Sequence, residues 1–160
     1  SKGLCRTSAA NCPEKRAWAL WVSVSSRMLR ASSTLEASMP PKATDLRPFV
    51  PCIDFALCKD FYASLGWETH EVSNGLALVR LGDAQHFYLQ DYYRREGAEN
   101  CMLHVTVEDA MGWYRHAATV VRERRFQAAR VQPPQHQPYG ALVTFLHDPS
   151  GVLLHLCQWA

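Results

Sequence analysis

At 160 residues, the chain is long enough for one domain with a substantial buried core. Apolar side chains make up 48% of it and charged side chains 20%, which is typical of a globular protein and not of a disordered one. The net charge is +2, but residues 1–39 hold six basic and two acidic side chains, so the other 121 residues carry −2. This balance argues against a nucleic-acid partner, and no apolar run approaches the roughly 20 residues of a membrane-spanning helix.

Residues 1–39 are predicted to be an extension outside the working domain. Ser, Ala and Arg are frequent, acidic residues are few, and the apolar residues follow no steady period. The composition is similar to that of an organellar presequence, and the alternative is an upstream extension with Met39 as the natural start. Residues 40–160 are then a single domain. Its four cysteines form no CxxC pair, so buried, reduced thiols in a cytoplasmic protein are expected and a zinc knuckle is not.

The first half of this domain predicts one helix and several strands. A short apolar stretch ends at Asp54, which is a good helix N-cap. Apolar residues at spacings of three and four then predict a helix over 55–65, and Gly66 ends it. Strands are predicted over 48–53, 67–71, 76–81 and 85–90, with a tight turn at Gly82-Asp83.

The second half repeats this order. A strand predicted over 102–107 leads to a second N-cap, Asp109, and an apolar stripe predicts a helix over 110–121. A polar, Pro-rich stretch follows, and two strands are predicted over 141–147 and 152–158. The interval from Gly75 to Asp83 is eight positions, as is that from Gly140 to Asp148. The sequence therefore predicts two βαβββ modules, at about 47–92 and 101–159.

The predicted fold class is α+β, with the two modules forming a curved mixed sheet around a concave pocket and the helices on the outside. Strand residues of one parity should point into that pocket, which is the usual place for a small ligand. Phe49, Tyr88 and Gln90 have this parity in the first module, and His104 and His155 have it in the second. Phe49 and Tyr88 could stack on a flat or cationic ligand.

Three segments carry a resemblance to a known superfamily. The first is FVPCIDFALCKDFYASLGW at 49–67. The second combines GDAQHFYLQDY at 82–92 with ENCMLHVTVED at 99–109, and the third is DPSGVLLHLCQ at 148–158. The stretch 47–159 resembles the vicinal-oxygen-chelate superfamily, which includes glyoxalases, bleomycin-resistance proteins and extradiol dioxygenases. The resemblance implies either a metalloenzyme or a metal-free protein that sequesters an antibiotic in clefts between the subunits of a homodimer.

The metal positions implied by this resemblance fall on Arg47, Gln90, Met102 and His155. A charged guanidinium cannot ligate, and a thioether is a poor ligand for the harder divalent ions. His155 is the one good donor, and His104 lies on the same predicted face two positions beyond Met102.

We therefore expect a small-molecule-binding protein of the bleomycin-resistance type that uses no cofactor. The alternative is a metal-dependent lyase or dioxygenase using His155, His104 and Gln90. Cys157 could also form a nucleophilic pair with His155 or His104, but the sequence shows no third residue that would orient the histidine.

Overall fold

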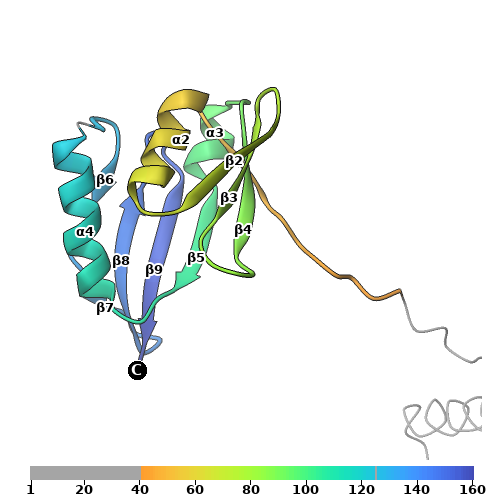
Figure 1. The fold of residues 1–160 in the computed structure, drawn as a ribbon. Coiled ribbons are helices and arrows are strands. Elements are labelled where there is room, and N and C mark those ends of the chain that lie inside the picture. The colour runs from red at the N-terminus through yellow and green to blue at the C-terminus, as the bar shows by residue number, and fades with distance from the viewer. Residues whose placement is uncertain (1–40, 125) are drawn as a thin grey trace, which may run out of the picture. The chain divides into compact units, whose positions relative to one another are not determined.

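The computed structural model describes residues 41–124 and 126–160, and the segment Asp45–Ala160 forms one compact unit (Figure 1). The extension predicted over residues 1–39 lies outside the described residues. No helix in the described part of the chain has the length and apolar content needed to cross a membrane.

The first module follows the predicted order. Its strands form a four-stranded sheet in the order β1-β4-β3-β2, in which β1 runs parallel to β4 and the other pairs are antiparallel. The side chain of Asp54 caps helix α2 by accepting a hydrogen bond from the backbone N–H of Leu57 at 2.9 Å. The elements are β1 (Phe49–Pro51), α2 (Phe55–Ser64), β2 (Glu68–Ser73), β3 (Leu76–Arg80) and β4 (His86–Gln90).

The second module forms a second mixed sheet. Its order is β5-β9-β8-β6, with the short β7 paired to β8, and β5 runs parallel to β9 as β1 does to β4. Asp109 caps its helix as predicted, since its Oδ1 accepts from Gly112 N at 2.8 Å. The elements are α3 (Arg95–Glu99), β5 (Met102–Thr106), α4 (Ala110–Glu123), β6 (Arg130–Val131), β7 (Gln135–His136), β8 (Ala141–His147) and β9 (Leu153–Trp159).

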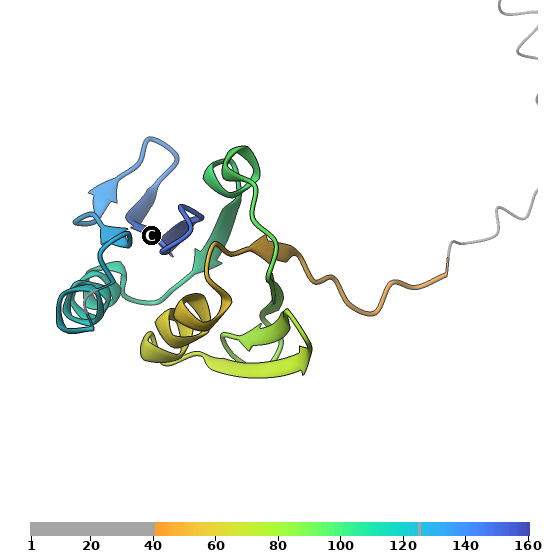
Figure 2. The ribbon, with the colours of Figure 1, turned by 90° about the horizontal axis from the view of Figure 1, so that it is seen from above.

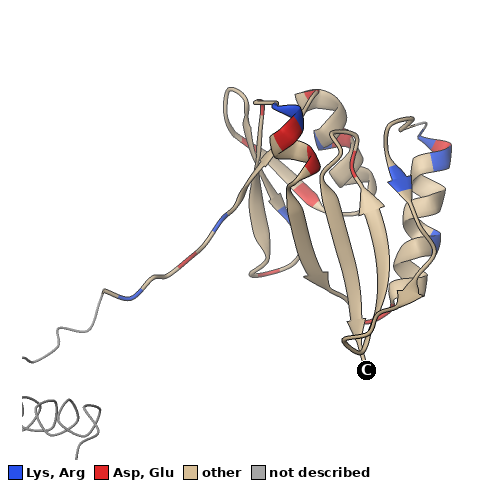
Figure 3. Cartoon of the chain, turned by 180° about the vertical axis from the view of Figure 1, so that it is seen from behind, with Lys and Arg blue, Asp and Glu red and all other residues tan. Residues whose placement is uncertain are grey.

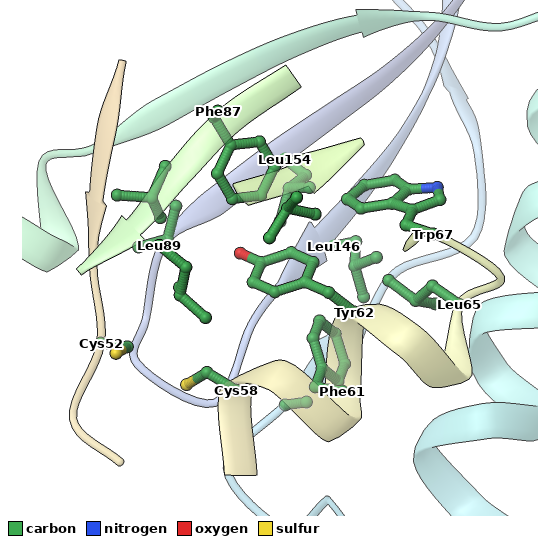
Figure 4. Close-up of a cluster of buried hydrophobic side chains, with 14 of the residues drawn as sticks. Cys52, Cys58, Phe61, Tyr62, Leu65, Trp67, Phe87, Leu89, Leu146 and Leu154 are labelled. Carbon is green, nitrogen blue, oxygen red and sulfur yellow. The ribbon is translucent and has the colours of Figure 1, made fainter. Parts of the chain in front are cut away.

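The α+β class and the two βαβββ modules are confirmed, and the structure refines how the modules pack. The strands form two sheets rather than one, and α2 lies between them (Figure 2). In Figure 4, Phe61 and Tyr62 of α2 lie among side chains of both sheets, including Leu89 of β4 and Leu154 of β9. One hydrophobic core therefore joins the two modules.

The N-caps give a direct test of these helix boundaries. Asp54→Ala should lower the free energy of unfolding by about 0.5–2 kcal/mol, because the Leu57 N–H loses its partner. Asp60→Ala is the matched control, since Asp60 is exposed on the same helix and caps nothing. Urea unfolding followed by circular dichroism measures both variants. An equal loss for the two would show that the Asp54 cap contributes nothing.

Candidate functional site

The faces of the two sheets that point away from the common core carry all five residues predicted to bind a ligand. In β1 and β4, Val50 and Leu89 are fully buried against the core, so the residues of opposite parity lie on the other side. The same alternation applies to β9, where Leu154 and Leu156 are buried. We call these outward sides the open face of the first sheet and the open face of the second sheet.

On the open face of the first sheet, Phe49 and Tyr88 are direct register partners on parallel strands. Their ring centroids lie 5.2 Å apart with the planes inclined by 33°, and the side chain of Phe49 is 57% exposed. Gln90 pairs with Pro51 one step further along the same strands. The structure thus brings Phe49, Tyr88 and Gln90 together into one partly aromatic surface.

A charged network borders this aromatic surface. Nη1 of Arg47 donates a hydrogen bond to the Tyr88 hydroxyl at 2.8 Å, and its guanidinium carbon lies 5.4 Å from the Tyr88 ring centroid. Asp45 accepts from Arg47 and lies 3.0 Å from Nε2 of His86. Hydrogen bonding to His86, and then to Arg47, lowers the pKa of Asp45 below its usual value. Asp45 lies before the first strand and belongs to no periodic pattern, so its place in this network could not be predicted from the sequence.

On the open face of the second sheet, His104 of β5 and His155 of β9 are register partners. Nδ1 of His104 lies 3.4 Å from Sγ of Cys157, and the His155 ring packs edge-on against Phe145 with centroids 4.9 Å apart. The buried Nε2 of His155 has no hydrogen-bond partner among the described residues. Burial, and then the charge of His104, lower the pKa of His155, which favours the neutral imidazole.

The predicted residues therefore form two groups, one on each sheet. Phe49, Tyr88 and Gln90 are neighbours on the first sheet, and His104 and His155 are neighbours on the second. His104 also lines a cavity of about 430 Å³ together with His86, at the boundary between β4 and β5. Phe49, Tyr88 and Gln90 do not line this cavity. The contacts described above therefore join residues within each group and not between the groups.

The metal-ligand positions that the resemblance implies do not fit a metal. Arg47 is engaged with Tyr88 and Asp45, and the Met102 side chain is 64% exposed on an edge strand. Among residues 41–124 and 126–160, no three His, Cys, Asp or Glu side chains gather closely enough to hold an ion. The donors near His155 include its register partner His104, Cys157 on the same strand, and His147, whose pKa the charge of His155 lowers, and none of them is the carboxylate of a facial triad.

Comparison with solved structures identifies the class of fold. The chain has the fold of the glyoxalase and bleomycin-resistance proteins, which confirms the resemblance at the level of fold. No family model and no curated protein matches the sequence itself.

Three solved structures illustrate the likeness. A bleomycin-binding protein in complex with bleomycin is 23% identical over 74% of this chain and all of that chain, with a TM-score of 0.61. A bleomycin resistance determinant encoded on a transposon is 24% identical over 73% of this chain and 98% of that chain, with a TM-score of 0.60. An antibiotic-binding protein from a Streptomyces species is 19% identical over 76% of this chain and all of that chain, with a TM-score of 0.58.

Proposed function

We propose that this protein binds and sequesters an antibiotic-like small molecule on its open faces and acts as a homodimer. The observation that carries the proposal is the exposed aromatic surface of Phe49 and Tyr88, bordered by Arg47, in a fold shared with antibiotic-binding proteins. The stacking surface provides affinity, and the polar Arg47–Asp45 pair beside it provides groups that orient a ligand. Sequestration requires no bond to be made.

Exposed apolar side chains on both open faces support the homodimer. Phe49 is 57% exposed on the first sheet, and Met102 and Trp159 are 64% and 49% exposed on the second. Exposed apolar side chains that form a contiguous patch usually mark an interaction site. If the first sheet of one subunit faced the second sheet of its partner, Phe49 and Tyr88 would lie opposite His104 and His155, and the ligand would bind between them.

The alternative, a metal-dependent lyase or dioxygenase, is favoured only by the adjacency of His104 and His155. It requires about one tightly bound divalent ion per chain, lost in His155→Ala. Metal analysis of the purified protein, before and after incubation with Fe, Ni, Mn or Zn salts, distinguishes the two functions. Retention of such an ion, with its loss in His155→Ala, would contradict sequestration without metal.

A thermal-shift titration with bleomycin tests the proposed binding. Ligand at about 100 times its Kd should stabilise the folded protein by about 2.7 kcal/mol and raise Tm. Phe49→Ala should reduce this shift, because one stacking partner is removed. Met111→Ala is the matched control, since Met111 is an exposed apolar residue on α4 away from both open faces.

Light scattering on the same samples should give the mass of a dimer. A monomer whose Tm no bleomycin concentration changes would contradict the proposal.

A further inference from the structure

A second cavity lies at the boundary between the two modules, and none of the five predicted ligand-binding residues lines it. Its volume is about 780 Å³, within the roughly 300–1,000 Å³ of small-molecule sites. It is open to solvent and is lined by the C-terminal end of α2, the turn between β3 and β4, and the connection from β5 into α4. We call it the boundary cavity. Its lining includes Leu65, Trp67, Gln85, Glu108, Trp113 and His116.

One wall of the boundary cavity is aromatic. The ring centroids of Trp67 and Trp113 lie 6.0 Å apart, and those of Trp113 and His116 lie 5.9 Å apart. Trp67 is only 6% exposed and belongs to the core at the end of α2 (Figure 4), whereas Trp113 and His116 have accessible surface. Nε2 of His116 lies 3.3 Å from the backbone oxygen of Leu65, which fixes the ring beside the end of α2. The planes of Trp113 and His116 are inclined by 79°, so a flat ligand that stacked on one ring would meet the other edge-on.

The charge of the boundary cavity is negative. Among the described residues that line it, Glu108 and Asp109 carry formal charges at neutral pH, and no Lys or Arg is present. Arg115 lies 3.8 Å from Asp109 and offsets part of that charge, but no described residue forms an ion pair with Glu108. The other arginine of α4, Arg122, lies in its last turn, and Figure 3 shows basic residues at that end of the helix. The negative C-terminal end of the α2 dipole and the positive N-terminal end of the α4 dipole both adjoin the cavity and oppose each other, so the two carboxylates determine its charge.

We propose that the boundary cavity binds a planar organic cation, an aromatic ring system with a fixed positive charge. The ring stacks on Trp113 and meets His116 edge-on, and the carboxylate of Glu108 balances the charge. Cation–π attraction to the indole acts in the same direction as this carboxylate. The site goes beyond the proposed open-face function and does not depend on it.

Ethidium, whose fluorescence responds to its surroundings, is a suitable probe for the full chain. We expect saturable binding of about one ethidium per chain and weaker binding of phenanthridine, which lacks the fixed charge. Glu108→Gln should raise the Kd for ethidium about threefold to tenfold, because the uncompensated carboxylate is removed. Glu96→Gln is the matched control, since Glu96 is an exposed acid on α3 that lines neither described cavity.

The outcomes separate this proposal from the open-face function. Loss of ethidium affinity in Glu108→Gln, with Phe49→Ala unchanged, places the cation in the boundary cavity. An equal loss in Glu96→Gln would mean nonspecific attraction to surface charge, and a loss in Phe49→Ala would place the dye on the open face. Either result, or the absence of saturable binding, overturns the proposal. Glu108→Gln should leave the bleomycin thermal shift unchanged, so failure at one site does not imply failure at the other.

Discussion

Tyr62→Ala should lower the free energy of unfolding by about 3–5 kcal/mol, the range for large aromatic residues removed from a core. Tyr62 is completely buried in α2, stacked on Trp67 at 5.5 Å and packed edge-on against Phe87 at 5.2 Å. Its hydroxyl donates a hydrogen bond to Oδ2 of Asp148 at 2.8 Å, in the turn between β8 and β9. The substitution therefore removes contacts within the first module and a polar contact with the second.

Tyr62→Phe separates these two effects. It keeps the ring and removes only the donor to Asp148, so we expect a loss of about 1–3 kcal/mol. Urea unfolding followed by circular dichroism gives both values. If Tyr62→Phe proves as stable as the parent, the bond between α2 and the β8–β9 turn contributes nothing to the joining of the modules.

The buried carboxyl of Asp148 should make stability depend on pH. Burial raises its pKa from 3.8 to about 6, although hydrogen bonds from Tyr62 and from the backbone of Val152 and Ser150 oppose the rise. The folded state therefore binds this proton more tightly than the unfolded chain does. The stabilising contribution is complete below pH 3.8 and is lost as pH rises through about 6. Two pKa units correspond to about 3 kcal/mol.

Asp148→Asn isolates this contribution from that of other carboxyl groups. The amide oxygen can still accept from the backbone N–H groups of Ser150 and Val152, and the amide nitrogen can donate to the Tyr62 oxygen. The stability of the variant relative to the parent should therefore rise by about 3 kcal/mol between pH 3.5 and pH 7. Unfolding curves collected at several pH values measure the difference. A difference that is independent of pH would show that Asp148 titrates normally in the folded protein.

Local patterns in the sequence were sufficient to predict each module. The caps Asp54 and Asp109 and the apolar spacing after each of them depend on residues close in the chain, and both helices form where expected. The glycines that align the modules, Gly75 and Gly140, both adopt a positive φ before the hairpin strand that follows. The short strands β6 and β7 in the Pro-rich stretch were not predicted, because two residues are too few to show an alternation.

The packing of the modules and much of the site could not be predicted. Each helix has an apolar face that either module could cover, so the position of α2 between two sheets is decided by burial across the whole chain. Strand parity correctly placed His104 and His155 on one side of the second sheet, but their direct pairing depends on strand register. Trp113 lies within the helix predicted over 110–121, and its place in the lining of the boundary cavity arises only when the modules meet.

The contact between Tyr62 and Asp148 joins residues 86 positions apart, and this separation has a consequence for folding kinetics. The parallel pairs β1–β4 and β5–β9 close shorter loops within each module, so each sheet can form before the modules dock. We expect docking after the rate-limiting step, so that Tyr62→Phe speeds unfolding while leaving the refolding rate nearly unchanged. The lifetime of the native protein would then depend on this late contact more than on either module.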